Sequence, residues 1–152
     1  MYLEDFVKKI NSKIIMYVDM DGVIADYEVG VAKNFDRKRP LYTSLEKLEI
    51  LSKKYEIEMH ILSVARFKNG IKEKNDWLDR YASFFENDNR HILSRELNDM
   101  KNAKTLKLEF LSKLVMNKDY KYIIIDDDPA ILREIMEMKK DFILLKDTCL
   151  VD

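Results

Sequence analysis

Glycine is scarce in this sequence, with only Gly22, Gly30 and Gly70 among 152 residues. The glycine-rich loops that cradle phosphates, the P-loop and the dinucleotide-binding fingerprint, need several glycines at fixed short spacings. Neither spacing occurs here, so both loops are excluded. Any phosphate that the chain binds must therefore be held by a metal ion, lysines, hydroxyl groups or helix N-termini.

Disulfides, a charge excess and long apolar runs are also lacking. The single cysteine, Cys149, cannot form an intramolecular disulfide, which fits a reducing cytosol. A net charge of −1 produces no basic field that would attract polyanions. No apolar run approaches the ~20 residues that span a bilayer, and residues 1–13 lack the apolar core of a secretory signal. We expect a soluble, cytoplasmic protein with no membrane partner.

Five short apolar runs predict buried strands, because nearly every side chain within them is apolar. They span about residues 14–19, 57–63, 90–94, 122–126 and 142–146. Between them, apolar residues recur at helical spacing. The alternation indicates one α/β domain over residues 1–152, with a parallel sheet covered by helices on both faces. Two helix starts carry local signals: a capping-box pattern at Thr43 and Glu46, and an N-cap followed by proline at Asp128-Pro129.

Two of these strands run directly into carboxylates. The first is followed by Asp19-Met20-Asp21-Gly22, and the fourth by Asp126-Asp127-Asp128. If the two strands are neighbours, both acidic tips share the carboxyl edge of the sheet, where open α/β folds bind ligands. Clustered like charges need a cation or a shared proton, and oxygen ligands suit Mg²⁺. Taken singly, each cluster also fits a solvated turn, and Asp128 fits a helix cap.

The order of these motifs resembles the haloacid dehalogenase (HAD) superfamily of phosphohydrolases. Its first motif, an apolar strand ending in Asp-x-Asp-Gly, is matched at residues 19–22, and its fourth, an acidic pair after a later strand, at Asp126-Asp127. Its second, a serine or threonine that ends the next core strand, is matched by Ser63, with Ser94 as the competitor. The resemblance implies a three-layer fold with a five-stranded parallel sheet in the order 3-2-1-4-5. It also implies a minimal cap, inserted at about residues 24–44.

The third HAD motif is a lysine at the start of a helix. Lys107 matches its spacing to Asp126, and Lys104 is the alternative. By the same resemblance, Ser63 would hydrogen-bond the transferring phosphate and Lys107 would bind it. Both side chains are single-residue matches within a lysine-rich chain, in which most lysines are expected to be solvated surface charges.

The resemblance also implies roles for the carboxylates. Asp19 would be the nucleophile that forms an aspartyl-phosphate. Asp19, the backbone carbonyl of Asp21 and Asp127 would hold Mg²⁺, with Asp126 supporting the metal site. Asp21 would protonate the leaving oxygen and then accept a proton from the attacking water.

Two stretches narrow the substrate class by resemblance. Residues 19–28 are similar to deoxyribonucleotidases of the 5′-nucleotidase type, and residues 107–127 to the 3′-phosphatase domain of phage-type polynucleotide kinase. Both groups remove a phosphate from a nucleotide or a nucleic-acid end. A sugar phosphatase of the same superfamily and a phospho-accepting module like response-regulator receivers are the alternatives. A small cap would leave the site open, either for a large substrate or for closure by a second subunit of a homo-oligomer.

Further basic and aromatic residues are candidates for substrate binding. Arg37 and Arg39, within Arg37-Lys38-Arg39, could contact a second phosphate or a nucleic-acid backbone, although a solvated loop is the simpler interpretation. Lys74 and Trp77 share a helix face, where the indole would either stack on a base or be buried. The two histidines, His60 and His91, are predicted to be ordinary strand residues.

Overall fold

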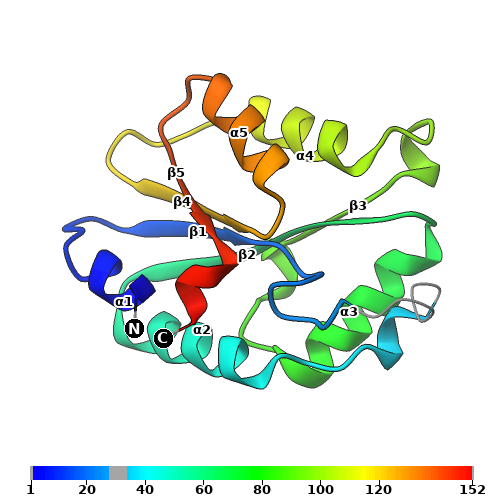
Figure 1. Ribbon diagram of the computed structural model, residues 1–152, viewed down its shortest axis with the longest axis horizontal. Helices are drawn as coiled ribbons and strands as arrows, with labels where there is room; N and C mark the ends of the chain where they lie inside the picture. Colours follow the sequence, from blue (N-terminus) through cyan, green and yellow to red (C-terminus); the bar gives the residue numbers. More distant parts are fainter. Residues whose placement is uncertain (1, 28–33, 152) are drawn as a thin grey trace.

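Five parallel strands form one sheet in the order β3-β2-β1-β4-β5 (Figure 1). The structure is a computed structural model that describes residues 2–27 and 34–151. The strands are β1 (Ile14–Val18), β2 (Ile57–Ala65), β3 (Arg90–Ser94), β4 (Lys121–Asp126) and β5 (Phe142–Lys146). Their positions and their order confirm the predicted α/β fold. The largest difference in length is at β2, which continues two residues beyond the predicted end at residue 63, whereas β1 ends one residue earlier than predicted and β4 begins one residue earlier.

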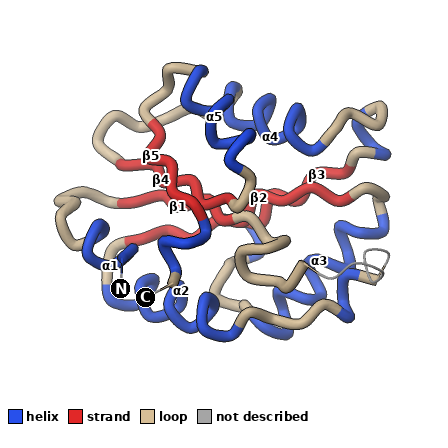
Figure 2. Tube along the Cα trace, in the orientation of Figure 1, coloured by secondary structure: helices blue, strands red, loops and turns tan. Residues whose placement is uncertain are grey.

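Helices cover both faces of the sheet, as expected for a parallel sheet (Figures 1 and 2). On one face lie α1 (Tyr2–Val7), α2 (Tyr42–Lys54) and α3 (Asn69–Tyr81), and on the other α4 (Ala103–Ser112) and α5 (Pro129–Glu137). Short 3₁₀ helices occur at η1 (Phe35–Arg37), η2 (Asn87–Asn89), η3 (Glu96–Asn98) and η4 (Asp147–Leu150). None of the helices within the described ranges is long and apolar enough to cross a membrane.

The strand register aligns the ends of the central strands. Val18 on β1 is paired with Ile61 on β2 and with Ile125 on β4. All five residues of β1 are buried, and its alternate side chains enter two separate apolar cores, one under each layer of helices. Consequently the residues that follow β1 and β4 emerge together at one edge of the sheet, and β2 continues beyond Ile61 for four more residues, to Ala65.

One of the two predicted helix starts is correct. Asp128 caps α5 by accepting a hydrogen bond from the backbone N–H of Ala130 at 2.9 Å, and Pro129 is the first helical residue. The predicted capping box at Thr43 and Glu46 is wrong, because α2 already begins at Tyr42 and no side chain of the described residues caps it.

Contacts distant in sequence set the start of α2 instead. The backbone N–H of Leu41, the residue before the helix, donates to Ile24 O at 2.8 Å, and Pro40 forms a bridge with Ala25. The segment after β1 therefore leads the chain into the helix. The predicted cap-like insertion at about residues 24–44 includes residues 28–33, which lie outside the described residues, and its end belongs to α2.

Candidate active site

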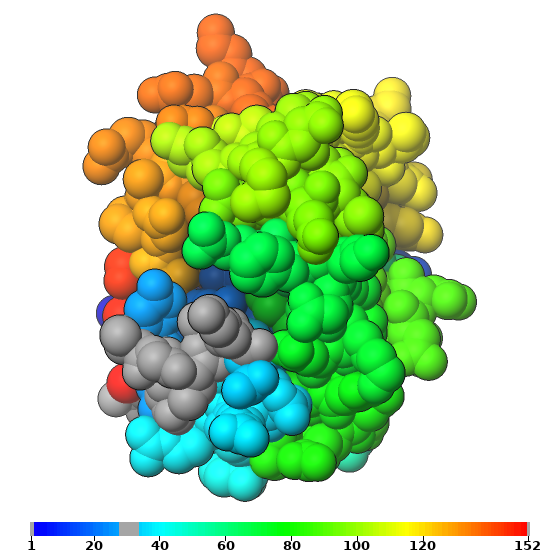
Figure 3. Space-filling model, turned by 90° about the vertical axis from the view of Figure 1, so that its right-hand side faces the viewer, coloured from blue at the N-terminus to red at the C-terminus, as the bar shows by residue number. Residues whose placement is uncertain are grey.

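The carboxyl edge of the sheet carries the predicted site residues. Asp19 follows β1 directly, and its backbone N–H donates to Ile125 O at 3.0 Å, which continues the pairing of β1 with β4. Figure 3 views the molecule toward this edge and shows a hollow, with blue atoms of the first part of the chain at its floor. The green segment after β2, the yellow-green segment after β3 and the orange start of α5 lie around this hollow.

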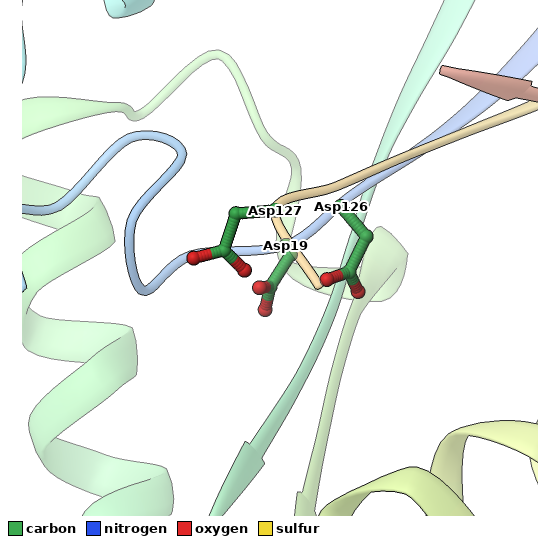
Figure 4. A group of neighbouring side chains, drawn as sticks. All are labelled: Asp19, Asp126 and Asp127. Atoms are coloured by element: carbon green, nitrogen blue, oxygen red, sulfur yellow. The ribbon is translucent and has the colours of Figure 1, made fainter. Parts of the chain in front are cut away.

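Three carboxylates converge at the tips of β1 and β4. One oxygen from each of Asp19, Asp126 and Asp127 lies within 4.8 Å of the others (Figure 4). Asp19 and Asp126 are buried, and Asp127 is partly exposed. An all-oxygen donor set with one solvent-accessible member fits a hard divalent cation such as Mg²⁺. The three aspartates are therefore able to hold a metal ion, as their positions after the two strands predicted.

Gly22 makes room for one of these carboxylates. Its φ is +77°, and a Cβ built on it would lie 2.2 Å from Asp127 Oδ2. Only glycine combines that backbone conformation with the close approach of the Asp127 side chain. The glycine of the Asp-x-Asp-Gly motif is thus part of the wall of the carboxylate site.

Lys107 neutralises part of the negative charge of the three aspartates. Its Nζ lies 3.0 Å from Asp19 Oδ1 and 2.7 Å from Asp126 Oδ2. Burial disfavours the charged amine, but the two carboxylates outweigh it and raise the pKa of Lys107. The alternative Lys104 pairs with Glu134 across α4 and α5, 40% of its side chain being exposed. The structure therefore places Lys107 at the carboxylates and Lys104 at the surface.

The ionised forms of two of these carboxylates are disfavoured, as their raised pKa values indicate. Burial raises the pKa of Asp19 to about 7, and Asp126 adds to this while Lys107 opposes it. Burial and the nearby Asp126 also raise the pKa of Asp127. With all three carboxylates ionised and Lys107 charged, the group would carry two net negative charges, which a divalent cation offsets.

Asp126 differs from the other two members because both of its oxygens already accept hydrogen bonds. Oδ1 accepts from the backbone N–H of Asp128 at 2.9 Å, and Oδ2 accepts from Lys107 Nζ. These bonds fix the carboxylate and use one acceptor position on each of its oxygens. Asp19 and Asp127 are therefore better placed to bind an ion directly, which fits the supporting role predicted for Asp126.

A second group of polar side chains lies toward α3. Ser63 is fully buried, and Lys74 Nζ donates to its Oγ at 2.6 Å and to Val64 O at 3.0 Å. Lys74 Nζ also lies 3.3 Å from Asp21 Oδ2. Ser63 faces α3 because it follows Ile61 by two residues, so both point to the same face of β2. The competitor Ser94 ends the outer strand β3, where its Oγ accepts from the N–H of Leu97 at 3.3 Å.

Lys38 belongs to this group and was missed by sequence reasoning. Its Nζ contacts Asp21 Oδ1, and its side chain is buried. Phe35 lies between the two lysines, with its ring centroid 4.8 Å from both Lys38 Nζ and Lys74 Nζ. Trp77 is 1% exposed and donates from Nε1 to Lys38 O at 2.9 Å, so it is a buried anchor and not a stacking surface.

The two arginines beside Lys38 point differently. Arg37 and Arg39 are exposed, and Arg39 NH2 pairs with Asp26 Oδ2 at 3.2 Å. The central residue of Arg37-Lys38-Arg39 is therefore the one that reaches the acidic motif, whereas the two arginines, the candidates for substrate binding, are exposed as the solvated-loop interpretation expected.

Both oxygens of Asp21 are held by cations, Oδ1 by Lys38 and Oδ2 by Lys74. Burial favours the neutral acid, but Lys74 and Lys38 outweigh it and lower the pKa of Asp21. For Lys74, burial disfavours the charged amine more than Asp21 and Asp19 favour it, so the pKa of Lys74 is lowered. Asp21 is therefore kept ionised and fixed in orientation in the free protein.

The two histidines form a separate pair on the other face of the sheet. His60 Nδ1 and His91 Nε2 lie 2.8 Å apart, their rings are stacked, and Tyr17 and Phe110 pack around them. His60 Nε2 bonds to Glu58 Oε1 at 2.7 Å. Both are strand residues, as predicted, and neither belongs to the group of three aspartates that could hold a metal ion.

Comparison with known proteins finds likeness in structure alone. No model of a protein family matches the chain, and no curated protein matches its sequence. A chain of the Pnkp1/Rnl/Hen1 RNA repair complex superimposes with a TM-score of 0.64 and 17% identity, over 89% of this chain and 43% of that one. A chain in a second Pnkp1/Rnl/Hen1 structure gives a TM-score of 0.67 and 14% identity, over 90% and 46%. These identities establish a shared fold, and this chain spans less than half the length of each neighbour.

Proposed function

We propose that the protein is a Mg²⁺-dependent phosphomonoesterase that acts through an aspartyl-phosphate, on the terminal phosphate of a nucleotide or nucleic acid. The observation that carries this proposal is the convergence of Asp19, Asp126 and Asp127 within 4.8 Å, with Lys107 beside them. Asp19 is a buried carboxylate at a site suited to a cation, and such a carboxylate can approach an anionic phosphate once its repulsion is offset.

In the first step, an Asp19 oxygen attacks phosphorus and the bond to the leaving oxygen breaks, with its electron pair passing to that oxygen. Asp21 donates a proton to the leaving oxygen, and the phosphoryl group stays on Asp19. In the second step, Asp21 accepts a proton from water, which attacks phosphorus and releases inorganic phosphate with Asp19 restored. Lys107, Lys74 and Ser63 would bind the phosphate oxygens, since all three present donors at this edge.

Asp19, Asp127 and the backbone carbonyl of Asp21 would hold Mg²⁺, with Asp126 keeping the site in shape. When bound, the ion neutralises charge between the nucleophile and the phosphate and stabilises charge that develops as the bond breaks. Asp21 must be protonated in the first step, although Lys38 and Lys74 favour its ionised form. An incoming phosphate would attract Lys74 to its own oxygens and so weaken the hold on Asp21.

One observation supports a nucleotide or nucleic-acid substrate over a sugar phosphate: the similar chains belong to an RNA repair complex. The alternative of a receiver-like module is disfavoured by the sheet order, because receivers of the CheY type have the order 2-1-3-4-5 and this sheet has 3-2-1-4-5.

The test is a phosphatase screen with Mg²⁺ or with EDTA. Substrates are p-nitrophenyl phosphate, nucleoside monophosphates, 3′-phosphorylated oligonucleotides and sugar phosphates. We expect Mg²⁺-dependent phosphate release that the Asp19→Asn variant loses, while its circular dichroism spectrum matches that of the wild type. Full Mg²⁺-dependent turnover by folded Asp19→Asn would refute Asp19 as the nucleophile, and a preference for sugar phosphates would refute the substrate class.

A further inference from the structure

A polymer whose terminal phosphate lies at Asp19 must leave the hollow across one of its sides. One side is the start of α5, where Asp126, Asp127 and Asp128 follow one another. Asp126 is buried and paired with Lys107, but Asp127 and Asp128 are accessible to solvent and repel a phosphodiester backbone. A second side is formed by the loops after β2 and β3, residues 66–68 and 95–101, which we call the β2–β3 rim. This step rests on the proposed function, because it assumes a phosphate at Asp19.

The β2–β3 rim is one connected surface. The backbone N–H of Arg95 donates to Ala65 O at 2.9 Å and that of Glu96 to Arg66 O at 3.0 Å. The Glu96 carboxylate accepts from the N–H of Lys68 at 2.8 Å. In Figure 3 the green and yellow-green segments accordingly lie side by side next to the hollow. The two loops therefore present their side chains together.

This rim exposes apolar side chains that no element within residues 2–27 and 34–151 covers. Phe67 is 45% exposed, Leu97 62% and Met100 43%. The guanidinium of Arg66 lies 5.3 Å from the centre of the Phe67 ring, leaving the ring with a cation on one side. Successive bases of single-stranded nucleic acids stack on aromatic side chains of this kind, with nearby cations contacting the backbone.

Hydrogen bonds fix the conformation of the loop after β3. The Arg95 side chain donates to Lys101 O at 3.0 Å and to Met100 O at 3.2 Å. Asp99 and Met100 both have positive φ, 54° and 56°, which non-glycine residues adopt at a cost. These bonds hold the strained turn that carries Met100 outward.

Charge distinguishes the β2–β3 rim from the acidic side of the hollow. The rim contains four basic residues and two acidic ones, and one of the two acids, Glu96, is engaged with the Lys68 N–H. Arg66 and Lys68 are both exposed. The rim thus offers stacking surface and positive charge together, whereas the start of α5 exposes the acid Asp128.

We propose that the β2–β3 rim binds the nucleotides adjacent to the terminal phosphate of a single-stranded oligonucleotide, with Phe67 stacking on a base and Arg66 and Lys68 contacting the backbone. The substrate of the site is then an oligonucleotide end rather than a mononucleotide, because a mononucleotide leaves the rim unused.

The test compares a 3′-phosphorylated octanucleotide, a nucleoside 3′-monophosphate and p-nitrophenyl phosphate on the full chain. For Phe67→Ala we expect kcat/KM for the octanucleotide, relative to that for p-nitrophenyl phosphate, to fall about 10-fold, within the range for loss of one stacked base. Tyr2→Ala is the matched control. Tyr2 is 76% exposed on α1, and the buried side chains of this helix pack against one face of the sheet, not at its carboxyl edge. Equal losses of kcat/KM for the octanucleotide and for p-nitrophenyl phosphate would refute the proposed role of the rim. A wild type that cleaves the mononucleotide as well as the octanucleotide would also refute it.

Binding separates this inference from the proposed function. Fluorescence anisotropy with a labelled octanucleotide needs no catalysis, so it can be measured even if the wild type releases no phosphate from any substrate. We expect Phe67→Ala to weaken binding about 10-fold, and Arg66→Gln to reduce the slope of log K against log salt by about 0.7, as for loss of one phosphate contact on a single strand. Unchanged affinity for the octanucleotide in Phe67→Ala refutes the proposed role of the rim. If the octanucleotide binds as expected but no phosphatase activity is found, only the proposed function is refuted.

Discussion

The contact between Gly22 and Asp127 yields a prediction that can be worked out atom by atom. A Cβ at position 22 would lie 2.2 Å from Asp127 Oδ2, 3.0 Å from its Cγ and 3.6 Å from its Cβ. The Gly22→Ala substitution therefore has two costs. An alanine held at a left-handed φ costs about 1–2 kcal/mol, and forcing the carboxylate aside is an overpacking of about 1–3 kcal/mol.

The double-mutant cycle separates these two costs. In an Asp127→Ala background the Oδ2 and Cγ atoms are gone, and the remaining Cβ at 3.6 Å is an ordinary contact. We expect Gly22→Ala to lower the free energy of unfolding by about 2–5 kcal/mol in the wild type, but only by about 1–2 kcal/mol when Asp127 is alanine. The difference is the coupling between the two residues.

Urea unfolding followed by tryptophan fluorescence measures the cycle, since Trp77 is the single tryptophan and is buried. Isothermal titration with Mg²⁺ gives the functional counterpart. Gly22→Ala displaces the Asp127 carboxylate, so we expect it to weaken Mg²⁺ binding as strongly as Asp127→Ala does. Equal destabilisation by Gly22→Ala in both backgrounds would show that the steric contact with Asp127 has no energetic weight.

Two further predictions concern the lysine beside Asp21 and the pair of stacked histidines. Lys38→Met should lower kcat at least about 10-fold for an alkyl phosphate such as a nucleoside 3′-monophosphate, whose leaving oxygen needs a positioned proton donor, but less than about 3-fold for p-nitrophenyl phosphate, which needs none. Arg37→Met is the control one residue away, and equal losses on both substrates would contradict a role through Asp21. Burial and the adjacent His60 lower the pKa of His91 to about 4. Because the unfolded chain takes up a proton near pH 6.5 that folded His91 does not, the free energy of unfolding should fall by up to about 2 kcal/mol from pH 7 to pH 5. Urea unfolding at both pH values should show this loss in the wild type and less of it in His91→Gln, and an identical loss in both proteins would contradict the assignment.

The elements that could be predicted from sequence are those set by local pattern. The apolar runs of β1 and β4 are buried on both faces, so their composition alone indicated central parallel strands. The placement of Asp19 beside Asp126 and Asp127 followed from the strand ends, because parallel neighbours finish at the same edge. Ser63 was likewise preferred over Ser94 from strand order, and the structure indeed has β2 beside β1 and β3 outside it.

The features that could not be predicted depend on contacts distant in sequence. The start of α2 follows from bonds to residues 24 and 25, which override the capping pattern at Thr43. Lys38 turns inward because its backbone is bonded to Trp77 and its neighbour Phe35 packs on the same indole, with ring centroids 5.8 Å apart. In the sequence, three consecutive basic residues give no sign of which one is buried.

The two halves of the site are supported by opposite helical layers, and this separation has a consequence. Asp19 is paired with Lys107 of α4, whereas Asp21, two residues later, is paired with Lys74 of α3 and with Lys38. The proposed nucleophile with the candidate cation site and the proposed acid/base with its lysines are thus anchored in different layers, on the two faces of one sheet. Changes on the α3 side should therefore alter proton transfer while leaving Mg²⁺ affinity near that of the wild type. Titration of Lys38→Met with Mg²⁺ tests this independence directly, because a large loss of affinity there would mean that the two halves form one coupled unit.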